Sequence, residues 1–125
     1  ARSKARRGEL ESVAARQLRR VHVVASEKKV YAQGYDLVVN ATPLGLKDSD
    51  KPPLKFEKLD GLRAVFDMVY RRGGVTPWVQ RARALGIPAV DGSEMLLQQA
   101  AAAFEIWWDV DAPVRAMRTA MESPA

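Results

Sequence analysis

The run RAVFDMVY at residues 63–70 decides the class of fold. It is apolar almost throughout and lacks the alternation of a half-exposed strand, so it predicts a strand buried on both faces, as parallel sheets contain. Residues 35–40 (YDLVVN) predict a second such strand, residues 87–90 a short third one and residues 21–24 a further short one. Helical segments are expected between strands. The pattern therefore indicates an α/β fold with a parallel sheet and flanking helices.

Helix signals separate and follow the strands. An amphipathic helix is expected at residues 4–20, and Thr76-Pro77 begins another, with Thr as N-cap and Pro at the first helical position, that ends at Gly86. A third starts near Ser93 and continues through four alanines to Trp107; its apolar composition predicts burial along much of its length. Asp111-Ala112-Pro113 is expected to cap a last helix at residues 114–121.

Composition limits the classes of function. The 125 residues fit one domain, 47% are hydrophobic and 28% charged, and no apolar run reaches the roughly 18–20 residues that span a bilayer. The basic N-terminus has no apolar stretch behind it, so we expect no signal peptide and a cytoplasmic protein. With no cysteine and only His22, no metal site is expected.

The net charge of +5 is concentrated at one end. Residues 1–29 carry nine Lys or Arg against three Asp or Glu. Such a segment either attracts nucleic acid, a membrane surface or a phosphorylated small molecule, or forms the solvated face of a helix. It has no interleaved aromatic residues and no nucleic-acid motif, so we expect neither a nucleic-acid nor a membrane partner.

Polar or small residues lie at or near the carboxyl ends of three of the expected strands, at Asn40, Thr42, Asp67, Tyr70 and Gly92. Ligands of open parallel sheets bind outside the carboxyl ends of the strands, so these residues are expected to face one crevice. Each has a plainer alternative. Asn40 and Thr42 either bond a ligand or close a turn, and Asp67 either acts chemically or satisfies backbone amides. Tyr70 either meets a ligand or caps the core, and Gly92 either lets a ligand approach or forms a left-handed turn.

Taken together, these motifs and their order resemble the shikimate dehydrogenase family. They are NATPLG at 40–45, DMVY at 67–70, TP at 76–77 and DG..ML...QAA..F..W at 91–107. The resemblance covers essentially the whole chain, and the last motif is the most specific. It implies NADP-dependent interconversion of 3-dehydroshikimate and shikimate, in the biosynthesis of chorismate and the aromatic amino acids, on a Rossmann-type NAD(P)-binding domain.

The resemblance also implies roles for individual residues. Thr42 would lie beside the cofactor, Met68 would pack near the nicotinamide, and Gly92 would approach the nicotinamide with its backbone. Tyr70 and Gln99 would contact the substrate; the spacing from the motif's methionine selects Gln99 and leaves Gln98 as a solvent or packing residue.

The N-terminus matches part of another family motif. Arg2 and Ser3 correspond to the last two residues of an Asn-Arg-Ser/Thr sequence whose arginine meets the 2′-phosphate of NADP, and a guanidinium binds phosphate bidentately. The pair Ser93-Glu94 departs from the family's usual Leu-Gly and places a carboxylate near the expected nicotinamide. A paralogue or a quinate-using relative is therefore an alternative.

Two parts of a whole family member have no counterpart in this sequence. The catalytic lysine and aspartate of the substrate-binding domain are missing, and Gly73-Gly74 follows the wrong strand to be the Gly-rich pyrophosphate loop. We therefore expect residues 1–125 to be the C-terminal portion of the nucleotide-binding domain. The helices at about 93–121 would pack back toward the substrate domain, as they do in the family.

Such a portion is expected to need a partner. The strands at 35–40, 63–70 and 87–90 would form a contiguous sheet with an open edge, to be covered by the N-terminal half or by a second copy in a homodimer. We expect the chain alone to be inactive. A non-catalytic nucleotide-binding or interaction module is the alternative from another class.

Overall fold

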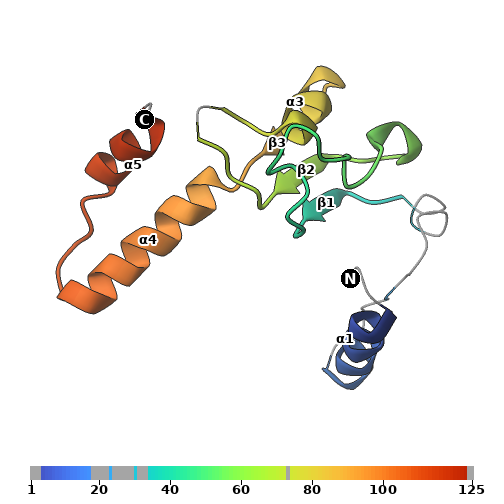
Figure 1. The fold of residues 1–125 in the computed structure, drawn as a ribbon, viewed down its shortest axis with the longest axis horizontal. Coiled ribbons are helices and arrows are strands. Elements are labelled where there is room, and N and C mark those ends of the chain that lie inside the picture. Colours follow the sequence, from blue (N-terminus) through green and yellow to red (C-terminus); the bar gives the residue numbers. More distant parts are fainter. Residues whose placement is uncertain (1–3, 18–22, 24–29, 31–33, 73, 124–125) are drawn as a thin grey trace. The chain divides into compact units, whose positions relative to one another are not determined.

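The computed structural model describes residues 4–17, 23, 30, 34–72 and 74–123 (Figure 1). The chain divides into two units, residues 1–34 and residues 35–125. The first contains the helix α1 (Lys4–Gln17), which confirms a helix up to residue 17. Its expected amphipathic character is wrong, because its few apolar side chains do not form one face and Leu10 and Val13 are exposed. Of the strand expected at residues 21–24 only Val23 is described, and it is not in a strand; the rest of that prediction lies outside the described residues.

A three-stranded parallel sheet organises residues 35–125. Its strands are β1 (Leu37–Asn40), β2 (Ala64–Asp67) and β3 (Ala89–Val90), in the order β1-β2-β3. Asn40 is in register with Asp67, so the carboxyl ends of β1 and β2 lie side by side. The predicted α/β class, the parallel pairing and the contiguous order are confirmed, although each strand is shorter than its apolar run.

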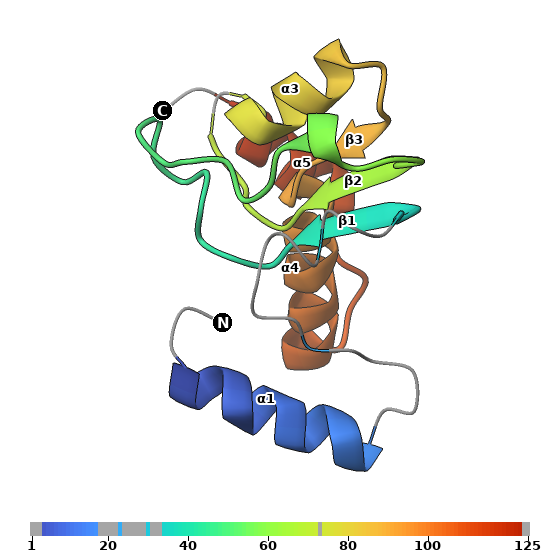
Figure 2. The same cartoon turned by 90° about the vertical axis from the view of Figure 1, so that its right-hand side faces the viewer.

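The core lies between this sheet and the helix α3 (Pro77–Ala84), which Figure 2 shows above the strands. The Thr76 side chain caps α3 by accepting from the Val79 amide, as expected from the Thr-Pro pair. A short 3-10 helix, η1 (Phe56–Lys58), stacks Phe56 on Trp78 with ring centroids 4.8 Å apart. The indole N–H of Trp78 donates to the Leu54 carbonyl at 3.1 Å, so this aromatic core has its polar group satisfied.

The expectation that the 35–40 strand is buried on both faces is wrong. Leu37 and Val39 project from the same face of β1 and are 53% and 46% exposed, whereas Asn40 is buried. The reason is the position of the strand, because β1 is at the edge of the sheet and α3 packs on β2 and β3. An apolar run therefore indicates that a strand is suited to burial. It does not show whether another segment of this chain covers the strand.

The helix α4 (Ser93–Trp108) begins and ends close to where the sequence predicts, but its predicted burial is wrong. Leu97 and Ala101 are its buried residues, while Ile106, Trp107 and Trp108 are 80%, 76% and 67% exposed. Figure 2 shows α4 extending below the sheet, on the side away from α3. Its apolar C-terminal half therefore lacks cover from residues 35–72 and 74–123.

The last helix, α5 (Val114–Glu122), packs against α4. Its expected cap at Asp111 is wrong: the N-cap position is Pro113 and no side chain caps the helix. The turn before it begins at Asp109, which ends α4 in the left-handed region with φ 53°. Among the helices described, none is both long and apolar enough to cross a membrane.

A buried carboxyl group joins the ends of the elements. Asp67 is fully buried; its Oδ1 accepts from the Asn40 side-chain amide at 2.8 Å and from the Val69 N–H at 3.1 Å. Its Oδ2 accepts from the Thr76 hydroxyl at 2.6 Å. The carboxyl ends of β1 and β2 and the start of α3 are thus held by one side chain, whose oxygens are satisfied internally.

We predict that Asp67→Asn destabilises residues 35–125 by about 1–3 kcal/mol, because an NH₂ group would face donors that now have an acceptor. Urea unfolding followed by tryptophan fluorescence measures this, since Trp78, Trp107 and Trp108 all lie in that unit. Asp60→Asn, at an exposed aspartate, is the control and should change stability by less than about 0.5 kcal/mol. Equal effects of the two substitutions would contradict the role given to Asp67.

Candidate functional site

The loop that follows β1 is closed by its own side chains. The Asn40 Oδ1 accepts from the Thr42 N–H at 3.0 Å and from the Thr42 hydroxyl at 2.7 Å, and the Asn40 amide donates to the Leu44 carbonyl at 2.9 Å. Asn40 is 2% exposed, so of its two interpretations the contacts favour turn closure. Thr42 is exposed at the strand end, where its hydroxyl also accepts from the Leu44 N–H at 3.2 Å.

The end of β2 meets the start of α4 at Met68 and Gly92. The Gly92 N–H donates to the Val69 carbonyl at 3.1 Å, and a Cβ built on Gly92 would lie 2.3 Å from the Met68 carbonyl oxygen. Gly92 has φ −78°, so it is not a left-handed turn residue as one alternative held. Glycine is needed here because two backbones touch, and this contact brings together two of the residues expected beside the cofactor.

Tyr70 lies at the rim of a cavity of about 390 Å³, together with Arg71, Arg118 and Met121. It is half-buried, and its hydroxyl donates to the Met121 carbonyl at 3.4 Å. From α4, Ser93 and Leu97 line this cavity and Gln99 does not; Gln99 is exposed elsewhere on the helix. Tyr70 and Gln99, the two residues expected to contact substrate, therefore do not line the same cavity in the described part of the chain.

Of the residues expected to contact the cofactor, Arg2 and Ser3 lie outside the described residues. The expectation that three strand ends face one crevice stays a prediction, although the backbones at these ends are close: Gly92, after β3, touches Met68, after β2. Asn40 and Asp67 meet, whereas Asp91, after β3, turns to the start of α4 and accepts from the Ser93 N–H at 3.0 Å and the Ser93 hydroxyl at 2.5 Å.

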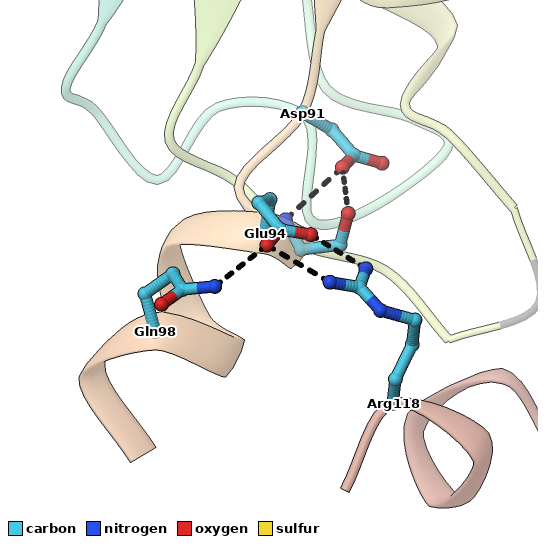
Figure 3. A network of polar contacts seen from close by, with 5 residues as sticks. Asp91, Glu94, Gln98 and Arg118 are labelled. Carbon is cyan, nitrogen blue, oxygen red and sulfur yellow. Dashed lines mark hydrogen bonds and ion pairs between the residues drawn. The ribbon is translucent and has the colours of Figure 1, made fainter. Parts of the chain in front are cut away.

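A polar network surrounds the first turn of α4 (Figure 3). Arg118, from α5, forms a bidentate pair with Glu94: Nη1 donates to Oε2 at 2.6 Å and Nη2 to Oε1 at 3.0 Å. The Gln98 amide donates to Glu94 Oε1 at 2.8 Å. Gln98 is thus hydrogen-bonded within α4, whereas the expected contact of Gln99 with substrate stays a prediction.

The hydrogen bonds from Arg118, followed by that from Gln98, lower the pKa of Glu94 from 4.5 to about 2. Conversely, the same carboxylate raises the pKa of Arg118. Sequence reasoning identified Glu94 as a departure from the family but missed Arg118. In the sequence Arg118 is only one of several basic residues in an amphipathic helix. Its partner Glu94 is 24 residues away, so no local pattern links the two.

Cavity size does not locate the site. A cavity of about 530 Å³ lies between residues 45–58 and the first turns of α3, with Leu54, Pro77 and Trp78 in its wall. It contains none of the residues expected to contact cofactor or substrate. The strand ends, which carry Thr42 after β1, Met68 after β2 and Gly92 after β3, are the better candidate because parallel sheets bind ligands there.

Comparison with known proteins identifies the kind of protein that shares this arrangement. The family model of the shikimate 5'-dehydrogenase C-terminal domain matches residues 92–122. Shikimate dehydrogenase (NADP(+)) of Methanocella arvoryzae is 46% identical over 82 residues, which are 66% of this chain and 30% of that protein. The chain spans about a third of the length of the curated relatives it matches.

Solved structures agree on the fold. The shikimate 5-dehydrogenase of Thermus thermophilus in complex with NADP(H) and shikimate superposes with a TM-score of 0.58 at 36% identity, covering 69% of this chain and 33% of that one. The shikimate dehydrogenase of Aquifex aeolicus gives a TM-score of 0.71 at 26% identity, covering 93% and 41%. The parallel sheet and flanking helices of this chain therefore have a partial Rossmann-type fold.

We predict that Gly92→Ala separates the start of α4 from the end of β2 and lowers stability by about 1–3 kcal/mol, since both contacting groups are backbone. Urea unfolding followed by tryptophan fluorescence reports it. The matched control is Gly8→Ala in α1, where an added Cβ meets nothing within 4 Å. A Gly92→Ala chain as stable as its parent would show that this junction is not closely packed.

The Glu94 pair gives a pH prediction. Because folding lowers the pKa of Glu94 from 4.5 to about 2, its stabilising effect is complete above 4.5 and disappears as the pH falls through that range toward 2. Unfolding midpoints of the parent and of Glu94→Gln, compared at each pH, should differ near neutrality and converge in acid. The difference should be small because the pair is exposed. A difference independent of pH would contradict the assignment.

Proposed function

We propose that this chain, which belongs to the shikimate dehydrogenase family through its C-terminal portion, forms the cofactor-side half of an NADP-dependent oxidoreductase. The whole enzyme would interconvert 3-dehydroshikimate and shikimate. The observation that carries the proposal is the contact between Met68 and Gly92 at the carboxyl ends of the strands, where family motifs far apart in sequence become neighbours. The bound nicotinamide would supply or accept the hydride in this reaction.

The residues at the strand ends fit the nicotinamide end of such a cofactor. Met68 is 41% exposed between the buried Asp67 and Val69, so it offers an apolar surface to a flat ring. Thr42 is exposed two residues after the end of the neighbouring strand β1, where its hydroxyl donates to Asn40. At Gly92 the backbone at the start of α4 touches the Met68 carbonyl. We propose these three as cofactor residues, and Arg2 with Ser3 as the residues that favour NADP through its 2′-phosphate.

Two residues are proposed to bind the substrate. Tyr70 lies at the rim of a cavity with its hydroxyl half-buried, so this hydroxyl has a defined position from which to meet a polar ligand. Gln99 is exposed on α4, while the neighbouring amide of Gln98 is held by Glu94. These residues bind and orient the substrate. The proton that accompanies hydride transfer would be handled by the lysine and aspartate of the substrate-binding domain.

The exposed apolar half of α4 supports the proposed domain organisation. Ile106, Trp107 and Trp108 are more than 65% exposed, together with Val110 beyond the helix. Burying such side chains contributes about 1.5–3 kcal/mol each, so this surface favours a covering partner. We propose that the substrate-binding domain covers it, that residues 1–125 are the C-terminal portion of the nucleotide-binding domain with its C-terminal helices, and that this chain alone is inactive.

The test joins the chain to the part it would need. We expect the 125-residue chain to produce no NADPH from NADP and shikimate. A fusion that places the N-terminal portion of the Methanocella arvoryzae relative before it should produce NADPH from shikimate, and quinate serves as the comparison substrate. Activity of the unfused chain would overturn the domain proposal. A folded fusion that neither binds NADP nor oxidises shikimate would overturn the function.

Within the active fusion, two adjacent glutamines provide a matched pair of variants. Gln99→Ala should lower kcat/KM for shikimate by about 10- to 100-fold, because the substrate group that Gln99 bonds would be left unpaired in a closed site, at a cost of about 1–3 kcal/mol. Gln98→Ala should leave it within about threefold. The reverse order of effects would show that the other glutamine contacts the substrate.

A further inference from the structure

The last helix, α5, is held to its unit chiefly by side-chain contacts. None of its residues is fully buried and no side chain caps it. Two polar contacts link it to elements earlier in the chain: the bidentate pair of Arg118 with Glu94, and the Met121 carbonyl that accepts from the Tyr70 hydroxyl. Arg118 and Met121 are three residues apart, so they lie on the same face of α5.

On the α4 side of the Glu94–Arg118 pair, several hydrogen bonds hold Glu94 in position. Asp91 accepts from both the N–H and the hydroxyl of Ser93, which holds the first turn of α4, and Glu94 comes next in that turn (Figure 3). Gln98, one turn further along α4, donates to the same carboxylate. Glu94 therefore presents its oxygens from a braced position, and Arg118 aligns on them with two hydrogen bonds. A bidentate pair restrains both the distance and the orientation of α5.

We propose that Glu94 and Arg118 are positioning residues for Tyr70: their pair seats α5 so that the Met121 carbonyl holds the Tyr70 hydroxyl at the rim of the substrate cavity. The departure from the family at Glu94 is then matched by an arginine in α5. Arg118 and Met121 line the same cavity as Tyr70, so α5 is one wall of the site. This inference rests on the proposed function for its meaning in catalysis, but its structural part can be tested without activity.

The first experiment uses the 125-residue chain and nuclear magnetic resonance of its tyrosine rings and methionine methyl groups. Arg118→Gln should shift the Tyr70 and Met121 signals and accelerate amide exchange in α5 about two- to fivefold, the size expected for an exposed pair. Arg115→Gln, which removes the same charge from an exposed position of the same helix, should leave these signals unchanged. Unchanged Tyr70 signals in Arg118→Gln, or equal shifts in Arg115→Gln, would overturn the proposal.

A double-mutant cycle assigns the effect to the pair. Glu94→Gln and Arg118→Gln should shift the Tyr70 signals alike, and the double variant should shift them no further than Arg118→Gln alone. Additive shifts would mean that the two residues act on Tyr70 separately, and the proposed coupling would be wrong.

The second experiment uses the fusion described above. Arg118→Gln should raise KM for shikimate about two- to fivefold with kcat retained, because a displaced Tyr70 weakens binding of substrate and transition state alike. A fall in kcat at unchanged KM would indicate general damage to the fold and would overturn the positioning role. An inactive parent fusion would instead count against the proposed function, while the resonance experiment would still decide the role of the pair.

Discussion

The carboxyl group of Asp67 is the point at which the strand ends and α3 are joined. Its two oxygens accept from Asn40, Val69 and Thr76, which belong to three different segments. A buried acceptor left without donors costs free energy, so separating these segments is unfavourable. Two exposed residues are tied to this carboxyl group: Thr42 through its hydrogen bonds to Asn40, and Met68 because it follows Asp67 in the chain. Asp67 therefore organises the candidate site without needing to touch a ligand.

A similar constraint applies at Gly92, where two different requirements can explain why the residue is a glycine. The family resemblance gives Gly92 a role toward the nicotinamide, whereas the structure gives it a role in packing, because a Cβ would strike the Met68 carbonyl. The two roles are compatible: the direct contact between backbones is what brings α4 to the strand ends. A residue can thus serve a site by allowing two elements to meet there.

Sequence reasoning predicted local structure well where a residue acts on its own neighbours. The Thr76 cap, the apolar strands and the parallel order follow from side-chain chemistry and connection length, and all three appear. It failed where the burial of an element depends on which other segment packs on it. The runs that form β1 and α4 were expected to be buried, yet Leu37 and Trp107 are exposed, because apolar composition does not say which other segment will lie on it. Long-range polar pairs such as Glu94 with Arg118 leave no local pattern, so Arg118 was not found.

These two failures have a common physical basis. An α/β domain is stable because both faces of its sheet and the apolar side of each helix are covered, and each covering element usually comes from a distant part of the sequence. In residues 35–125, α3 covers one face of β2 and β3, while β1 and the C-terminal half of α4 keep apolar side chains in contact with water. The apolar surfaces that contradict the sequence-based burial are thus those that the proposed substrate-binding domain would cover. Leu37 and Val39 lie on the face of β1 opposite to Val38, which packs against the aromatic core, so a partner that covers them would not need to displace that core.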